Sequence, residues 1–283
     1  MKMARLALAL GLLAMLPCLA QGETAAEAFQ RGGALLKQGD FPKALTAYAA
    51  AARADSENQD YTRQYALVRQ VMALRDRLAT EQDPRRWEYF ARALHRFYVA
   101  SGLLDEALAL DKQIHARLNN ASSAVLLAQT QLSMNRNAEA AEVLGSLGAQ
   151  KATVSTQALQ GVALGRLGKT DEARQIADAM AVPSDAGPGE LYTVARLHAV
   201  TGNADGALRF LGQCFEAVPP SQLPAFKRHA EASPDFVTLA SSPGFAEVLK
   251  TESKVSESKC SGGSKCAGCP SRGKCPSSQA AGH

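Results

Sequence analysis

The hydrophobic positions along most of the chain recur at the three-to-four-residue spacing of amphipathic helices. Trp87, Ala91, Leu94 and Tyr98 form one such run, and a Gly follows it at position 102. Gly and Asn tolerate the left-handed backbone conformation that ends many helices. The pattern therefore predicts helices joined in pairs by tight turns.

This pattern repeats along the chain. In five segments a Gly or Asn is followed, five residues later, by an Ala, and these alanines are spaced by 63, 33, 33 and 34 residues. Asp40, Asp105 and Asp171 stand where an acidic side chain stabilises the start of the next helix. The Ala allows the two helices of a hairpin to approach closely. The alanines are Ala44, Ala107, Ala140, Ala173 and Ala207.

The period and the Gly-x-[aromatic/Leu]-x-x-Ala pattern resemble the tetratricopeptide repeat (TPR). The first copy matches best, at Gly32, Leu35, Gly39, Phe41, Ala44, Tyr48 and Ala51. The resemblance implies an all-α fold over residues 21–217, a solenoid of helical hairpins wound into a right-handed superhelix. Stacked hairpins bury a continuous core that one hairpin alone cannot.

Two regions depart from the repeat. The step of 63 residues is shorter than two periods, so residues 59–84 hold either one long helix or a degenerate hairpin. After residue 217, the apolar side chains Phe236, Leu239, Phe245 and Leu249 predict a short helical cap over 218–250, because a terminal repeat needs its exposed face covered. Residues 251–283 are poor in apolar side chains and are expected to be a disordered tail.

Composition and charge narrow the function. The 283 residues are 46% hydrophobic but include only nine Phe, six Tyr and one Trp, which favours packed helices over sheets. From Lys250 onward six Lys or Arg stand against two Glu, whereas the 23 basic and 25 acidic side chains between residue 20 and the tail nearly balance. The folded part therefore gives no indication of a nucleic-acid-binding face.

The first 20 residues have the pattern of an export signal. A basic start is followed by an apolar run over residues 6–16 and by a small-x-small site at Cys18-Leu19-Ala20. The run is too short for a membrane span, although a retained anchor is one alternative. Lipid attachment at Cys18 is another, disfavoured by Pro17. The expected location is periplasmic or secreted.

No catalytic motif is present in the folded part. The sequence has no Gly-x-Ser-x-Gly, no phosphate-binding Gly-Lys-Ser/Thr loop and no His-x-x-x-His pair. His95, His115, His198 and His229 are isolated helical histidines, and Cys214 is expected to be a buried, inert thiol. We therefore expect a non-enzymatic protein.

In the TPR family the first helix of each repeat lines a concave groove, and the resemblance carries this role to nine residues. Four of them are arginines, whose guanidinium groups bind carboxylates well, so the expected partner is a protein or acidic peptide. The alternative is that they are ordinary solvated helix residues. The nine are Tyr89, Arg92, Arg96, Ser122, Gln129, Ser133, Arg166, Tyr192 and Arg196.

The tail carries a second candidate site. Cys260, Cys266, Cys269 and Cys275 follow the pattern C-x5-C-x2-C-x5-C, and a Lys directly precedes three of them. In an oxidising compartment two disulfides are favoured. A nine-residue unit starts at Cys260 and again at Cys269, which suggests the pairs 260–266 and 269–275. Zinc or another thiophilic metal on four thiolates is the second possibility. A redox or cross-linking thiol is the third.

Overall fold

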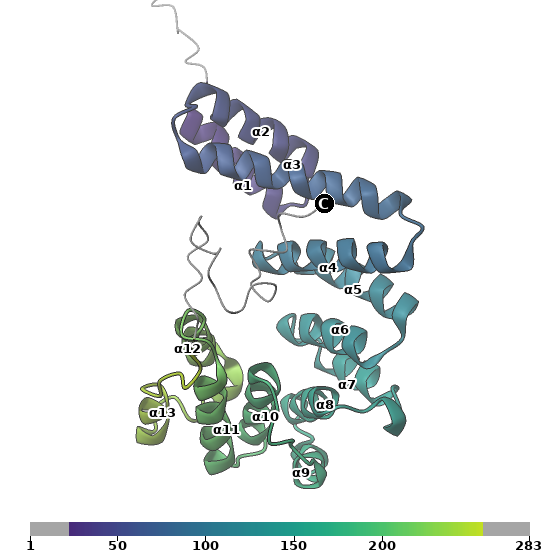
Figure 1. Ribbon diagram of the computed structural model, residues 1–283, viewed down its shortest axis with the longest axis vertical. Helices are drawn as coiled ribbons and strands as arrows, with labels where there is room; N and C mark the ends of the chain where they lie inside the picture. Colours follow the sequence, from purple (N-terminus) through teal and green to yellow (C-terminus); the bar gives the residue numbers. More distant parts are fainter. Residues whose placement is uncertain (1–22, 257–283) are drawn as a thin grey trace, which may run out of the picture. The chain divides into compact units, whose positions relative to one another are not determined.

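Residues 23–256 are described by the computed structural model, and they form thirteen α-helices, two short 3-10 helices and no strand (Figure 1). They divide after Leu103 into two compact units. Unit 1 holds α1 (Ala25–Lys37), α2 (Phe41–Ala54), α3 (Gln59–Thr80) and α4 (Pro84–Ala100). Unit 2 holds α5 (Leu104–Leu118), α6 (Ala121–Ser133), α7 (Asn137–Gly145), η1 (Ala149–Lys151), α8 (Val154–Arg166), α9 (Thr170–Ala179), α10 (Pro188–Val200), α11 (Ala204–Ala217), α12 (Leu223–Ala232), η2 (Pro234–Phe236) and α13 (Pro243–Val248).

Unit 1 begins with the best-formed hairpin. Helices α1 and α2 pack closely, and the ring of Tyr48 lies directly over Gly32, where an added Cβ would come within 2.9 Å of it. Phe29 contacts Tyr48 edge-on at 5.3 Å between ring centroids. The Gly at position 32 is therefore required by the close approach of an aromatic ring.

Helix α3 is a single helix of 22 residues, where the sequence left open one long helix or a degenerate hairpin. It buries only Val68 and Val71. It ends at Thr80, and α4 starts at Pro84, because proline fits the first turn of a new helix.

Unit 2 continues the antiparallel packing of neighbouring helices. Helices α6, α8 and α10 also pack side by side, α6 on α8 and α8 on α10, so they form a row (Figure 1). Ala128, Val162 and Leu197, one from each helix of this row, belong to the same buried cluster. This stacking of hairpins gives the all-α repeat architecture expected from the sequence.

The turns within the hairpins confirm the predicted helix ends. Gly39, Gly102, Gly168 and Gly202 all have positive φ, between 71° and 79°, and Asn135 takes the same role with φ 57°. The five alanines of the repeat, at positions 44, 107, 140, 173 and 207, are all fully buried. The carboxylate of Asp40 accepts a hydrogen bond from the backbone N–H of Lys43 and caps α2, as expected.

The C-terminal cap covers the last hairpin. Phe236, Leu239 and Phe245 are buried in one cluster with Leu211 and Phe215 of α11. Beyond α13 the backbone N–H of Lys254 donates to the carbonyl of Glu216, so the chain runs back along α11. The apolar residues that the sequence assigned to a closing segment do close this end of the core.

Three sequence predictions lie outside the described residues, wholly or for the most part. They are the export signal of residues 1–20, the disorder of the tail, of which only residues 251–256 are described, and the cysteine cluster of the tail. Within residues 23–256, no helix combines the length and the apolar character that a bilayer crossing needs.

The positive φ of the hairpin turns leads to a stability prediction. A Cβ at Gly168 would touch nothing within 4 Å, so Gly168→Ala changes only the cost of the left-handed backbone and should lower the free energy of unfolding by about 1 kcal/mol. Gly212, inside α11 and equally uncrowded, is the matched control, and Gly212→Ala should stabilise by up to about 1 kcal/mol. Urea denaturation followed by circular dichroism measures both. Equal effects at the two sites would contradict this account of the turns.

Candidate functional site

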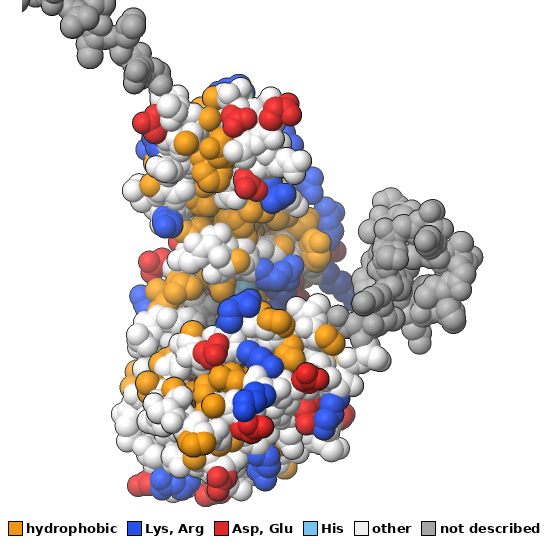
Figure 2. All heavy atoms as spheres, turned by 90° about the vertical axis from the view of Figure 1, so that its left-hand side faces the viewer, with side chains coloured by type: hydrophobic (Ala, Val, Ile, Leu, Met, Phe, Trp, Pro, Cys, Tyr) orange, Lys and Arg blue, Asp and Glu red, His pale blue; other side chains and the backbone are white. Residues whose placement is uncertain are grey.

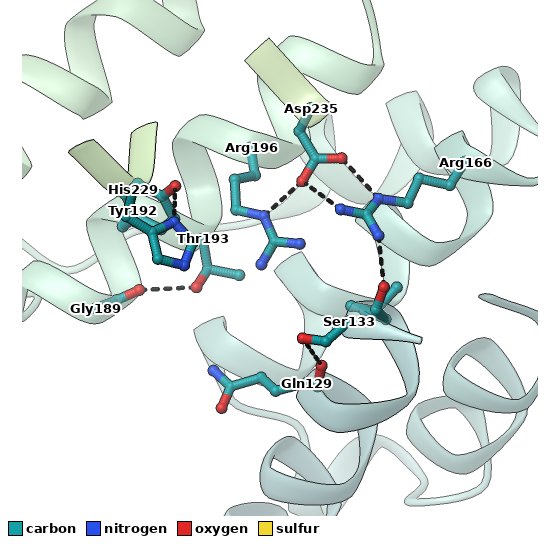
Figure 3. A network of polar contacts seen from close by, with 10 residues as sticks. Gln129, Ser133, Arg166, Gly189, Tyr192, Thr193, Arg196, His229 and Asp235 are labelled. Atoms are coloured by element: carbon teal, nitrogen blue, oxygen red, sulfur yellow. Dashed lines mark hydrogen bonds and ion pairs between the residues drawn. The ribbon is translucent and has the colours of Figure 1, made fainter. Parts of the chain in front are cut away.

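A hollow of about 670 Å³ lies in unit 2, lined by α6, α8, α10 and α12 and by the turns after α6 and α12. We call it the groove (Figure 3). Its lining combines polar, basic and aromatic side chains. The lining residues are Gln129, Leu132, Ser133, Asn135, Arg166, Gly189, Tyr192, Thr193, Arg196, Phe226, His229, Ala232, Ser233 and Pro234.

One carboxylate joins two helices of the row to the cap. Arg166 of α8 donates from Nε to Oδ1 of Asp235 at 2.7 Å and from an Nη to Oδ2 at 3.1 Å. Arg196 of α10 donates from Nε to Oδ2 of the same Asp235 at 2.6 Å. Arg166 also donates to the carbonyl of Leu132 at the end of α6, at 2.9 Å. The cluster therefore links α6, α8, α10 and η2 (Figure 3).

Asp235 is ionised in this cluster. Its side chain is only 1% exposed, and the two arginine side chains are 14% and 13% exposed. Burial by itself raises the pKa of Asp235, but the hydrogen bonds and positive charges of Arg166 and Arg196 outweigh it and leave the pKa below its usual value. The cluster holds two positive charges against one negative charge.

The excess positive charge faces the groove. Among the described residues Arg196 forms its one hydrogen bond through Nε, and Figure 3 shows its two terminal nitrogens pointing away from Asp235, toward the side where Gln129 lies. None of the groove-lining residues between 23 and 256 is an Asp or Glu. The groove can therefore accept an anionic group at Arg196.

An aromatic end adjoins this basic site. The hydroxyl of Tyr192 lies 2.8 Å from Nδ1 of His229, and its ring contacts Phe226 edge-on at 6.2 Å between centroids. Burial raises the pKa of Tyr192 to about 12, so the hydroxyl stays protonated. This part of the groove is suited to an apolar or aromatic side chain.

The opposite wall of the groove is polar and exposed. Ser133 donates to the carbonyl of Gln129 within α6, which fixes its hydroxyl against the helix. Both side chains are exposed. On the face of the molecule seen in Figure 2, basic, acidic and hydrophobic side chains of unit 2 are interspersed, so no single charge dominates that face.

The structure brings five of the nine predicted residues together in the groove, and these are Gln129, Ser133, Arg166, Tyr192 and Arg196. Ser122 lies at the start of α6 and does not line the groove. Tyr89, Arg92 and Arg96 lie on α4 of unit 1, where Tyr89 is 66% exposed and Arg92 pairs with Glu88 at 2.8 Å.

Two of the predicted arginines are less exposed than expected. The sequence predicted Arg166 and Arg196 to be exposed and available to a partner's carboxylate, but both are largely buried and already bind a carboxylate of the chain itself. Tyr192 is likewise only 8% exposed. These side chains therefore have a structural role in addition to lining the groove.

Sequence reasoning missed Asp235 and the position of His229. Asp235 lies 69 residues from Arg166 and 39 from Arg196, inside a segment read only as an apolar cap. The one available signal was the acidic Asp235 directly before Phe236, an apolar residue that is buried. A solvent-exposed loop would require neither of these two residue types.

Cys214 and His198 are further candidate residues within the described part of the chain. Cys214 is fully buried, and burial raises the pKa of its thiol to about 12, as expected of a structural cysteine. His198 is buried and stacked on Phe210. Within residues 23–256 no group of three or more His, Cys, Asp or Glu is placed to hold a metal ion.

Comparisons with known proteins add little to this picture. No family model matches the sequence, and no curated protein matches it. Among solved structures, a thermophilic TPR protein of Thermus thermophilus is similar to this chain, with 21% identity over 74% of this chain and 98% of the other, at a TM-score of 0.40. The repeat architecture of this chain is established by the packing of its own helices.

Removal of the shared carboxylate should destabilise unit 2. Asp235→Asn leaves two largely buried guanidinium groups without a counter-charge and should lower the free energy of unfolding by about 3 kcal/mol. The pKa of Asp235 is lowered in the fold, so its ionised carboxylate adds to the free energy of unfolding. This added stability is complete above the pKa that Asp235 has in the unfolded chain, and it is lost as the pH falls through the pKa that Asp235 has in the fold. The difference between wild type and variant should therefore shrink below about pH 4.

Urea denaturation between pH 3 and pH 7 measures this difference. Glu247→Gln is the matched control, because its ion pair with Lys250 is exposed and should contribute within about 0.5 kcal/mol. A cost at Asp235 no larger than at Glu247 would contradict the structural role of the cluster.

Proposed function

We propose that this chain is a non-enzymatic scaffold that binds a segment of a partner protein in the groove of unit 2. The observation that carries the proposal is the convergence of five predicted groove residues, from three neighbouring helices, on one hollow. A row of packed helices is a rigid wall for an extended peptide. The polar rim and the aromatic end supply hydrogen bonds and an apolar contact.

The partner segment carries a carboxylate, either an acidic side chain or a chain terminus. The terminal nitrogens of Arg196 are directed into the groove, and guanidinium groups bind carboxylates through paired, charge-assisted hydrogen bonds. Asp235 shows that the arginines of this row bind a carboxylate in the fold itself. An acidic partner also neutralises the extra positive charge of the cluster.

Unit 1 offers a further contact surface on α4. Tyr89 is the most exposed aromatic residue there, and Arg96 is also exposed. Exposed Tyr and Arg are the residue types that contribute most to protein interfaces. We propose them as a separate protein contact of unit 1.

The cysteine pattern supports a second candidate function in an exported protein. With four cysteines, three of them directly preceded by a Lys, the tail is suited to metal binding or thiol exchange, with the repeats docking it to a client. The residues that favour this function are Cys260, Cys266, Cys269 and Cys275.

A photo-cross-linking experiment tests the groove. With a benzoyl-phenylalanine in place of Gln129 or Ser133, the protein expressed in its own cells should form an adduct with a defined partner, since both side chains are exposed and line the groove. The same residue in place of Gln175 on α9 or Ser241 in the cap, both exposed and outside the groove, is the control.

Charge reversal of the rim is the matched binding measurement. Gln129→Glu with Ser133→Glu should weaken the cross-linked partner's affinity about tenfold or more by repelling its carboxylate, whereas Gln175→Glu with Ser241→Glu should leave it unchanged. Fluorescence anisotropy with a peptide from the adduct gives the dissociation constants. Equal adducts from all four positions, or equal affinities of the two double variants, would overturn the proposal.

The tail predicts a distinct result for the second candidate function. Protein purified under oxidising conditions, after removal of residues 1–20 and with them Cys18, should show no free thiol except Cys214 if the tail forms two disulfides. Reduced protein with zinc should bind about one metal ion if the four thiolates act together. Thiol titration and elemental analysis separate these cases. The variant Cys266→Ser should remove one disulfide in the first case and weaken the metal site in the second. Four reactive, metal-free thiols would leave only the redox role.

A further inference from the structure

A second hollow, of about 730 Å³, lies on another side of helix α10. We call it the loop pocket, because residues 180–187 between α9 and α10 form one wall and α11 forms the other. Leu191 lines the loop pocket, whereas Tyr192 and Arg196, on a different face of the same helix, line the groove. The loop pocket is therefore a separate site.

The inner wall of the loop pocket is apolar. Met180, Val182 and Phe210 are only partly buried, and Val182 and Phe210 each pack against both core clusters of unit 2. The pocket thus opens where the two clusters meet and exposes apolar surface from each. A hollow of several hundred Å³ with an apolar wall is the size and character of a small-molecule site.

The charges at the rim favour an anion. Glu216 is neutralised by Lys254, with 2.7 Å between Nζ and Oε1. Arg209 lies over the ring of Phe210, with its Cζ 4.7 Å from the ring centroid, and no carboxylate of the described residues lies within ion-pair distance of it. An unpaired guanidinium thus stands beside the apolar wall.

From these observations we propose that the loop pocket binds a small apolar molecule that carries one carboxylate. The apolar body lies against Met180, Val182 and Phe210, and the carboxylate pairs with Arg209. This combination satisfies both the exposed apolar surface and the unpaired cation, and a neutral or cationic apolar molecule satisfies only the first. The proposal does not depend on the groove or on any protein partner.

Decanoate is the probe, used below its micelle concentration on the full chain, with 1-decanol as its neutral counterpart. Methyl-labelled methionine gives a local signal, because Met180 lines the loop pocket whereas Met72 and Met134 do not. Decanoate should shift the Met180 methyl resonance saturably and leave those of Met72 and Met134 in place, and it should bind about tenfold more tightly than decanol.

Arg209→Gln should weaken decanoate about tenfold and leave decanol unchanged, whereas Arg228→Gln, an exposed arginine outside the loop pocket, should change neither. The exposed position of Arg209 means that the variant should fold. No shift at Met180, equal affinity for acid and alcohol, or an unchanged affinity in Arg209→Gln would each overturn the proposal. Binding seen only after deletion of residues 257–283 would also overturn it, since the tail would then be the natural occupant.

Discussion

The pairing of one buried carboxylate with two arginines connects the repeats of unit 2 to the segment that closes them. Asp235 has lost almost all contact with water, so its charge is tolerated only because Arg166 and Arg196 surround it. Arg166 also donates to the carbonyl of Leu132, one of the last acceptors of α6, which accepts from the backbone N–H of Asn135 in the turn as well. Three successive helices of the row are thereby held in register with η2. The apolar contacts of Phe236 and Phe245 close the core in the same place, but they are not directional, and the arginine pair fixes where the cap docks.

The same cluster determines the chemistry of the groove. One carboxylate neutralises one of two guanidinium groups, and the terminal nitrogens of Arg196 remain on the groove side. The proposed ligand preference of the groove therefore follows from how the cap is attached. A partner's carboxylate at Arg196 would complement a charge that the fold has already desolvated in part, and its electrostatic interaction would be stronger there than at a surface arginine. The Tyr192 and His229 pair belongs to this arrangement as well, because α12 brings His229 to the helix row.

The repeat was predictable from the sequence because its requirements are local. A left-handed turn at Gly168 or Asn135 and a buried Ala such as Ala173 each depend on a few neighbouring residues, and their spacing revealed the hairpins. The cap was predictable only as an apolar segment. Its ion-pair cluster was not, because Asp235 meets arginines 39 and 69 residues away and an isolated aspartate has no periodicity. Of the four predicted arginines, Arg166 and Arg196 line the hollow, and their exposure was overestimated from the sequence. Helix periodicity indicates which face a side chain occupies, but another segment of the chain can cover that face.

A double-mutant cycle between Arg196 and Asp235 tests the central claim most directly. The free energy of unfolding is measured by urea denaturation for wild type, Arg196→Gln, Asp235→Asn and the double variant, with Lys250→Gln and Glu247→Gln as the cycle for an exposed pair. If the cluster fixes the cap, Arg196 and Asp235 should show a coupling energy of about 1.5 kcal/mol or more, against about 0.5 kcal/mol or less for the exposed pair. Additive effects at Arg196 and Asp235, within about 0.5 kcal/mol, would contradict the account.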